Sequence, residues 1–283
     1  MTAFSPLAAA LEGARVIRRE PMAVLSWVGL WLVALIVVGA IVVFTAPHLA
    51  APRPPGGVLN LAHSFGPFWP ALISTLLILW IMTTATVFRA VLRPEERGWR
   101  LLKLGADEAR LAVFTVIGAL IVDPLGRASN LLVWVLTQPF LLVVPTPGQS
   151  FVFGGAVATV CLLIWIAVRL SLAPVYTFDT HRYHLVSYWD ITQTHFWRLF
   201  LSYLLVAVQM AGLYLAMLPI TVGLHLVAGA HPVLVEIVSD LLTFVVSLLA
   251  WTIYCACQAA AYKAIMLNPP PAFRPTAPRR KIP

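Results

Sequence analysis

Long, uninterrupted runs of hydrophobic residues dominate the pattern along this chain, and polar residues gather between them. Five runs are long enough to cross a bilayer as helices, because about 20 apolar residues span the hydrocarbon core and a helix satisfies its own backbone hydrogen bonds. These runs are Met22 to Thr45, Ala71 to Phe88, Phe151 to Val168, Leu199 to Leu218 and Leu241 to Tyr262. The pattern predicts an all-α, polytopic membrane protein.

A sixth hydrophobic run, Leu111 to Val122, is shorter and stops at the sequence DPLG. Its helix would rise only about 18 Å, so it has to continue past Pro124 or be helped by its flanks. We interpret residues 123–149 as the outer end of this kinked helix followed by an interfacial or re-entrant piece. About six transmembrane helices result.

Composition and charge agree with this interpretation and add an orientation. The chain is 60% hydrophobic and 11% charged, with a mean hydropathy of +0.89. Of 19 Lys and Arg residues, all except Arg53 and Arg127 lie in the N-terminal arm, in residues 89–110, in residues 169–198 or from residue 263 onward. Cations mark cytoplasmic loops, so both termini are predicted to lie in the cytoplasm. These loops account for the net charge of +8, and we expect no nucleic-acid partner.

Short sequences around the hydrophobic runs recur three times. FRAVLRP, VRLSLAP and YKAIMLNP close the second, fourth and sixth helices, and each places a cation five or six residues before a proline. EGARVIRREPMAVL, GWRLLKLGADEARL and SYWDITQTHFWRLF lead into the odd helices. This predicts three hairpin-like pseudo-repeats, each with a cytoplasmic amphipathic helix such as Ser187 to His195, and with Trp189 and Trp197 at headgroup level.

We expect residues 1–267 to form one membrane domain and residues 268–283, which are basic and rich in proline, to form a disordered cytoplasmic tail suited to anionic lipid. The three cysteines lie in predicted helices, and we interpret Cys161, Cys255 and Cys257 as reduced, buried packing residues.

Polar residues of the last helix recur at steps of three, four or seven, which places them on one helical face. We call this face the polar stripe, and it comprises Glu236, Asp240, Thr243, Ser247, Tyr254, Gln258 and Tyr262. Such a stripe is costly in lipid, so we expect it to face the bundle interior. It either lines a cavity for a polar or amphipathic molecule or joins helices to one another.

Candidate contacts for anionic lipid headgroups are the cations and histidines near the cytoplasmic helix ends, namely Arg89, Arg169, Lys263, His181 and His184. His181 and His184 with Asp179 resemble an incomplete metal site, but Pro174 and Asp179 favour a loop, and no fourth ligand is evident. We therefore predict no metal. Sensing of pH by the histidines is an alternative role.

The chain contains none of the common nucleophile, zinc-protease, phosphate-loop or dinucleotide motifs. We therefore expect no enzyme activity and no cofactor.

The stretches FRAVLRPEERGWRLLKLGADEARL and VRLSLAPVYTFDTHRYHLVSYWDITQTHFWRLF resemble the bacterial glycerophosphoryl diester phosphodiesterase membrane domain family. This resemblance covers most of the chain and implies six helices in the bacterial inner membrane. The soluble catalytic barrel of such phosphodiesterases would need roughly 250 further residues, so we expect that activity to be absent.

Two functions stay open on the sequence. The first is the handling or binding of lipid or another amphiphile, supported by the hairpins, the interfacial helices and the polar stripe. The alternative is a non-catalytic membrane scaffold or regulator of an unknown protein partner, supported by the cytoplasmic amphipathic segments.

Overall fold

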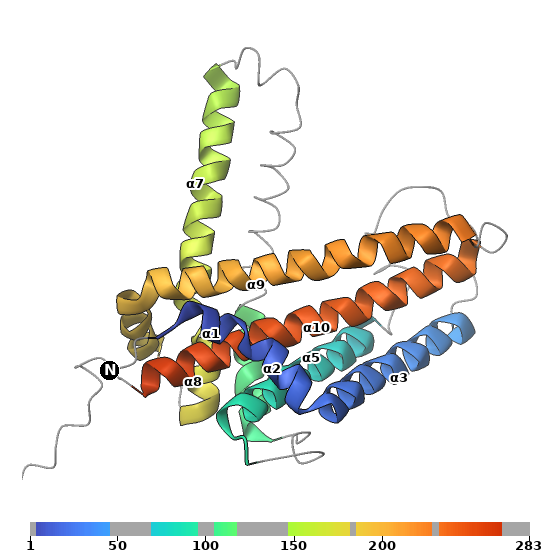
Figure 1. The fold of residues 1–283 in the computed structure, drawn as a ribbon, viewed down its shortest axis with the longest axis horizontal. Coiled ribbons are helices and arrows are strands. Elements are labelled where there is room, and N and C mark those ends of the chain that lie inside the picture. Colours follow the sequence, from blue (N-terminus) through green and yellow to red (C-terminus); the bar gives the residue numbers. More distant parts are fainter. Residues whose placement is uncertain are drawn as a thin grey trace, which may run out of the picture.

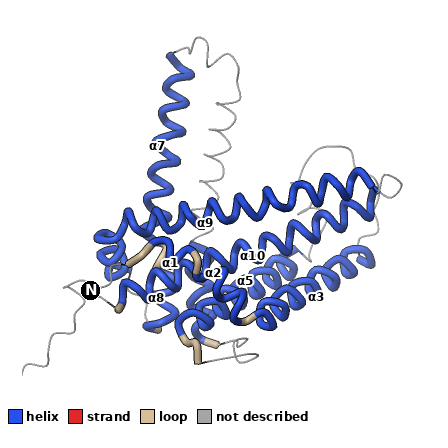
Figure 2. Tube along the Cα trace, viewed as in Figure 1, coloured by secondary structure: helices blue, strands red, loops and turns tan. Residues whose placement is uncertain are grey.

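The computed structural model describes residues 4–45, 69–95, 105–117, 147–181, 185–227 and 232–267. Within these ranges the chain is helical apart from short turns, and it contains no β-strand (Figure 2). The helices are α1 (Pro6–Ala10), α2 (Glu12–Arg19), α3 (Pro21–Thr45), α5 (Trp69–Leu92), α7 (Pro147–Leu170), α8 (Ala173–Thr180), α9 (Leu185–Val227) and α10 (Pro232–Met266), with a further helix at residues 106–117. The predicted all-α class is confirmed for the described residues.

Five described helical stretches are long and apolar enough to cross a membrane: Pro21–Ala40, Ser74–Leu92, Val157–Thr180, Thr192–Leu224 and Val235–Met266. They overlap the five long hydrophobic runs of the sequence, in agreement with a multi-pass membrane protein. The sixth predicted helix is described only as far as residue 117. The count of six and the three pseudo-repeats therefore stay predictions, and the tail at 268–283 lies outside the described residues.

Four long helices, α3, α5, α9 and α10, run in roughly one direction, whereas α7 leaves them at a steep angle (Figure 1). Helix α10 lies between α9 and α5 and contacts both. Helices α1 and α2 cross over α10, so the N-terminal arm covers part of this layer (Figure 1). Helix α7 packs against α9, and most of its length stands apart from the other described helices.

Helix α2 is amphipathic, as predicted for the segment before the first span. Gly13 and Val16 are buried, while Arg15 and Arg19 lie on the exposed side and pair with Glu12 at 2.9 and 3.3 Å. A Cβ atom added at Gly13 would lie 2.5 Å from the Cα atom of Ile253. The glycine thus allows α2 to approach the backbone of α10 closely.

Tryptophans join α3, α5 and α10 in the core. The indole nitrogen of Trp31 donates to Thr83 Oγ1 at 2.9 Å, and that of Trp251 donates to Thr84 Oγ1 at 3.1 Å. The rings of Trp80 and Trp251 lie 4.1 Å apart between centroids. A buried indole N–H needs an acceptor, so the two threonines allow these large rings to be packed between helices.

The segment with Pro174 and Asp179 corrects one expectation, because it forms helix α8 rather than a loop. Proline is tolerated in the first turn of a helix, where its missing N–H would have no intrahelical acceptor. The helix ends at Thr180 and is capped by His181, whose φ of 57° is left-handed. The next helix, α9, extends for 43 residues, so the predicted amphipathic segment Ser187 to His195 continues into a span without a break.

The cysteines divide into two kinds. Cys255 and Cys257 are buried in α10, as predicted, but Cys161 on α7 is exposed. The prediction of a buried Cys161 is wrong because α7 stands apart from the helix layer, so a hydrophobic helix here keeps open faces (Figure 1).

Candidate functional site

Arg89, near the C-terminal end of α5, lies in the interior. Its side chain is 5% exposed and pairs with Glu108, which is 4% exposed. The backbone N–H of Gly105 donates to the second carboxylate oxygen of Glu108 at 2.7 Å, and the guanidinium of Arg89 lies 5.5 Å from the ring centre of Phe178. A buried charge needs this kind of pairing, and the position does not suit the predicted contact of Arg89 with a headgroup.

Asp179 and His181, which are close in sequence, contact different partners. Tyr262 donates to Asp179 Oδ2 at 2.8 Å, whereas His181 Nδ1 lies 2.7 Å from Asp107 Oδ1, which also accepts from Arg110 at 2.6 Å. Asp179 and His181 therefore do not converge on one point. Among the described residues no group of three His, Cys, Asp or Glu side chains is placed to hold a metal ion, and His184 lies outside them. We call Arg89, Glu108, Phe178, Asp179 and Tyr262 the packed junction.

Lys263 is exposed, and its ammonium donates to the carbonyl oxygen of Val91 at 3.1 Å. This bond links the ends of α10 and α5. A lysine ammonium has three donors, so this contact leaves room for the predicted headgroup contact.

The polar stripe of α10 does not face the interior along its whole length. Gln258 and Tyr262 are buried, and Tyr254 is half-buried with its ring 5.7 Å from that of Tyr203. Ser247 lies 2.9 Å from the hydroxyl of Tyr214 on α9. The remaining stripe residues are exposed in the structure, and these are Glu236, Asp240 and Thr243.

The interior prediction therefore holds for the second half of α10 and is wrong for the first half. Helices α1, α2 and α8 pack on α10, and the buried stripe residues all lie in its second half. Spacing within α10 does not reveal which part of the helix these elements cover. Thr243 satisfies its hydroxyl by donating to the Ser239 carbonyl at 2.8 Å. Such a back-bonded hydroxyl is acceptable on an apolar surface.

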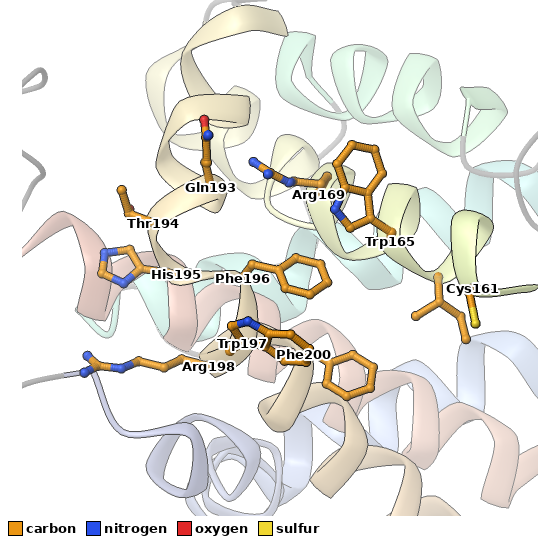
Figure 3. A pocket seen from close by; sticks show the side chains of 11 residues that line it. Cys161, Trp165, Arg169, Gln193, Thr194, His195, Phe196, Trp197, Arg198 and Phe200 are labelled. Atoms are coloured by element: carbon orange, nitrogen blue, oxygen red, sulfur yellow. The ribbon is translucent and has the colours of Figure 1, made fainter. Parts of the chain in front are cut away.

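A cleft of about 720 Å³ lies where the C-terminal half of α7 meets the first part of α9 (Figure 3). Helix α7 contributes Cys161 and Trp165, and α9 contributes the run from Gln193 to Arg198. The complete lining is Cys161, Ile164, Trp165, Arg169, Gln193, Thr194, His195, Phe196, Trp197, Arg198 and Phe200. We call this the α7–α9 cleft.

The α7–α9 cleft combines aromatic walls with positive charge. The Arg169 guanidinium lies 5.2 Å from the ring centre of Trp165 and is largely buried. Figure 3 shows the Arg169 side chain extending toward α9, while His195 and Arg198 lie together on the other flank. None of the described residues that line the cleft is acidic. The cleft therefore favours a ligand with a negative charge and an apolar part.

An exposed apolar face of α9 begins at the cleft. Trp197, which lines the cleft, is 75% exposed, and Leu201, Leu204 and Val208 follow it at steps of four, three and four residues. Residues at these steps lie on one helical face. We call Trp197, Leu201, Leu204 and Val208 the apolar track.

Sequence reasoning located part of the cleft and missed the rest. Arg169 was expected to meet headgroups and Trp197 to lie at headgroup level, and both line the cleft. Trp165, Phe196 and Phe200 were missed. The signal for the last two was their helical spacing of four, which predicts a shared face, and their rings do stack 6.3 Å apart.

Comparison of the chain with protein-family models, with curated proteins and with solved structures finds no match. The resemblance to the phosphodiesterase membrane domain family stays a prediction.

Proposed function

We propose that this protein is a multi-pass protein of the bacterial cytoplasmic membrane that binds an anionic lipid or similar amphiphile in the α7–α9 cleft. The observation that carries the proposal is the composition of the cleft. Aromatic walls and two arginines line one cavity, no described lining residue is acidic, and the apolar track begins at its edge.

The size and chemistry of the cleft suit such a ligand. Small-molecule sites usually have volumes of about 300–1,000 Å³, and the cleft has a volume of about 720 Å³. Guanidinium groups bind phosphate or carboxylate oxygens through several parallel hydrogen bonds. Trp165, Phe196 and Phe200 offer an apolar surface to the carbon atoms next to the headgroup. The combination of arginines and aromatic side chains favours an amphiphile over an anion that has no apolar part.

The distribution of cations supports an orientation with both termini in the cytoplasm. Arg169 and Arg198 belong to one of the cation-rich regions, so the cleft is proposed to open at the cytoplasmic surface of the membrane. The role is binding or handling of the amphiphile without a chemical step, because the sequence contains no recognisable nucleophile or metal motif.

The test is to identify the molecules that the protein retains through gentle purification, by mass spectrometry of the extracted lipids. The decisive variant is Cys161→Trp, which adds bulk to the cleft from an exposed position. Its matched control is Gly155→Trp on the same helix, because Gly155 has no neighbouring atom within 4 Å of an added Cβ and does not line the cleft.

We expect the wild type and Gly155→Trp to retain an enriched anionic amphiphile and Cys161→Trp to lose it. If Cys161→Trp retains as much of the amphiphile as Gly155→Trp and the wild type, the proposal is contradicted. Recovery of bulk lipid alone, together with a co-purifying soluble protein, would favour the alternative role of a membrane scaffold or regulator.

A further inference from the structure

The polar end of the α7–α9 cleft indicates which headgroup the ligand carries. Arg198 follows Thr194 by four residues and His195 by three on α9, so the side chains of Thr194 and His195 are both helical neighbours of Arg198. Arg198 is exposed, and Figure 3 shows His195 and Arg198 side by side on the flank opposite Trp165. This cluster offers a hydroxyl, an imidazole and a guanidinium to one ligand group.

From this cluster we infer that the cleft binds the part of an amphiphile that carries a phosphate and one hydrocarbon chain. The phosphate lies at Thr194, His195 and Arg198, and the hydrocarbon chain lies along the apolar track. The inference rests on the proposed function and specifies its ligand. A terminal phosphate carries between one and two negative charges at neutral pH and three strong acceptor oxygens. Arg198 presents a planar fork of donors that matches these oxygens.

The geometry of α9 sets the direction of the ligand's hydrocarbon chain. Leu201 follows Arg198 by three residues and Trp197 by four, so the apolar track begins directly beside the phosphate cluster. Leu204 and Val208 continue the track along the helix. Arg169 on α7 lines the same cleft and adds a second positive charge, which strengthens the attraction for an anion over a zwitterion.

The same headgroup chemistry occurs in a lipid and in free phosphate, and the experiment separates these sources. Native mass spectrometry of the full-length protein measures the binding of dodecyl phosphate, dodecylphosphocholine and octyl phosphate, with inorganic phosphate added as a competitor. The variants are Arg198→Gln and the double variant Leu201→Ala/Leu204→Ala. The control is Arg19→Gln, which removes an exposed arginine outside the cleft.

We expect dodecyl phosphate to bind about tenfold more tightly than dodecylphosphocholine, in line with a charge-assisted hydrogen bond that the zwitterion satisfies less well. Arg198→Gln removes this preference, and Arg19→Gln leaves it unchanged. The double leucine variant weakens dodecyl phosphate several-fold more than octyl phosphate, because it shortens the apolar track.

Equal binding of the two dodecyl compounds by the wild type, or an unchanged preference in Arg198→Gln, would overturn the phosphate assignment while leaving the cleft as a lipid site. Displacement by millimolar inorganic phosphate, with no dependence on chain length, would assign the cluster to a soluble phosphate and overturn the inference. A leucine variant that changes the oligomeric state and leaves binding intact would assign the apolar track to a second copy of the chain.

Discussion

Two arginines near the ends of hydrophobic helices have opposite surroundings. Arg89, in the last turn of α5, meets the carboxylate of Glu108 and the ring of Phe178 inside the packed junction. Arg169, in the last turn of α7, meets Trp165 and lines an open cleft without an acidic residue in its described lining. The sequence motifs around them are similar, so the neighbouring helices decide which groups the cation meets.

The largest expected effect breaks the packed junction. Glu108→Gln keeps the size of the side chain but removes the carboxylate charge that pairs with the buried Arg89. Loss of one member of a buried ion pair costs about 3–5 kcal/mol. We expect the free energy of unfolding, measured by denaturant titration in detergent, to fall by this amount. The double variant Arg89→Gln/Glu108→Gln should recover most of the loss, and equal losses in both would show that the charge pairing is unimportant.

The second effect concerns the close approach of α2 to α10. Gly13→Ala places a Cβ atom 2.5 Å from the Ile253 Cα atom, so one helix has to move, at a cost of about 1–3 kcal/mol for overpacking. The control Gly29→Ala adds a methyl group where no atom lies within 4 Å. We expect a lower melting temperature for the first variant only. Equal melting temperatures would contradict the tight contact.

A smaller effect is expected at the edge of the packed junction. Tyr262→Phe removes the hydroxyl that donates to Asp179 at 2.8 Å. Hydrogen bonds to charged groups contribute about 1.5–3 kcal/mol, and partial access of water to Asp179 lowers this, so the expected loss is about 1 kcal/mol. Thermal unfolding in detergent checks it. A variant as stable as the wild type would show that this hydrogen bond does not contribute to the stability of the protein.

The smallest stability effect should come from the cleft. Trp197 is 75% exposed, so Trp197→Ala should change the free energy of unfolding by less than about 0.5 kcal/mol. It should nevertheless weaken retention of the ligand, since this ring joins the cleft to the apolar track. A large loss of stability would mean that the Trp197 ring stabilises the fold, as the packed junction does.

The hydrophobic pattern was sufficient to predict the long helices, and cation spacing was sufficient to locate Arg89 and Arg169 at helix ends. These features did not reveal the different surroundings of the two arginines, because Glu108 reaches Arg89 from a different helix, 19 residues along the chain. Neither the helix α8 nor the angle of α7 followed from periodicity. Pro174 is compatible with a turn or a first helical turn, and the direction of a helix depends on contacts between distant segments.

The cleft illustrates the same limit. Its halves, near Trp165 and Phe196, are about thirty residues apart, and only the packing of α7 on α9 brings them together. The polar stripe was predicted from spacing within one helix, which defines a face but does not reveal what covers it. Thr243 and Gln258 consequently share a predicted face and differ in burial.

The most direct test of the central claim, that the α7–α9 cleft holds an anionic amphiphile, uses its own cysteine. Cys161 is exposed and lines the cleft, whereas Cys255 and Cys257 are buried. In a Cys255→Ala/Cys257→Ala background, the rate of maleimide labelling at Cys161 is compared between nanodiscs of phosphatidylglycerol and of phosphatidylcholine. The reference is Gly155→Cys in a chain that also carries Cys161→Ser. We predict several-fold slower labelling of Cys161 in phosphatidylglycerol and no such difference at position 155. Equal rates in the two lipids at Cys161 would contradict the account.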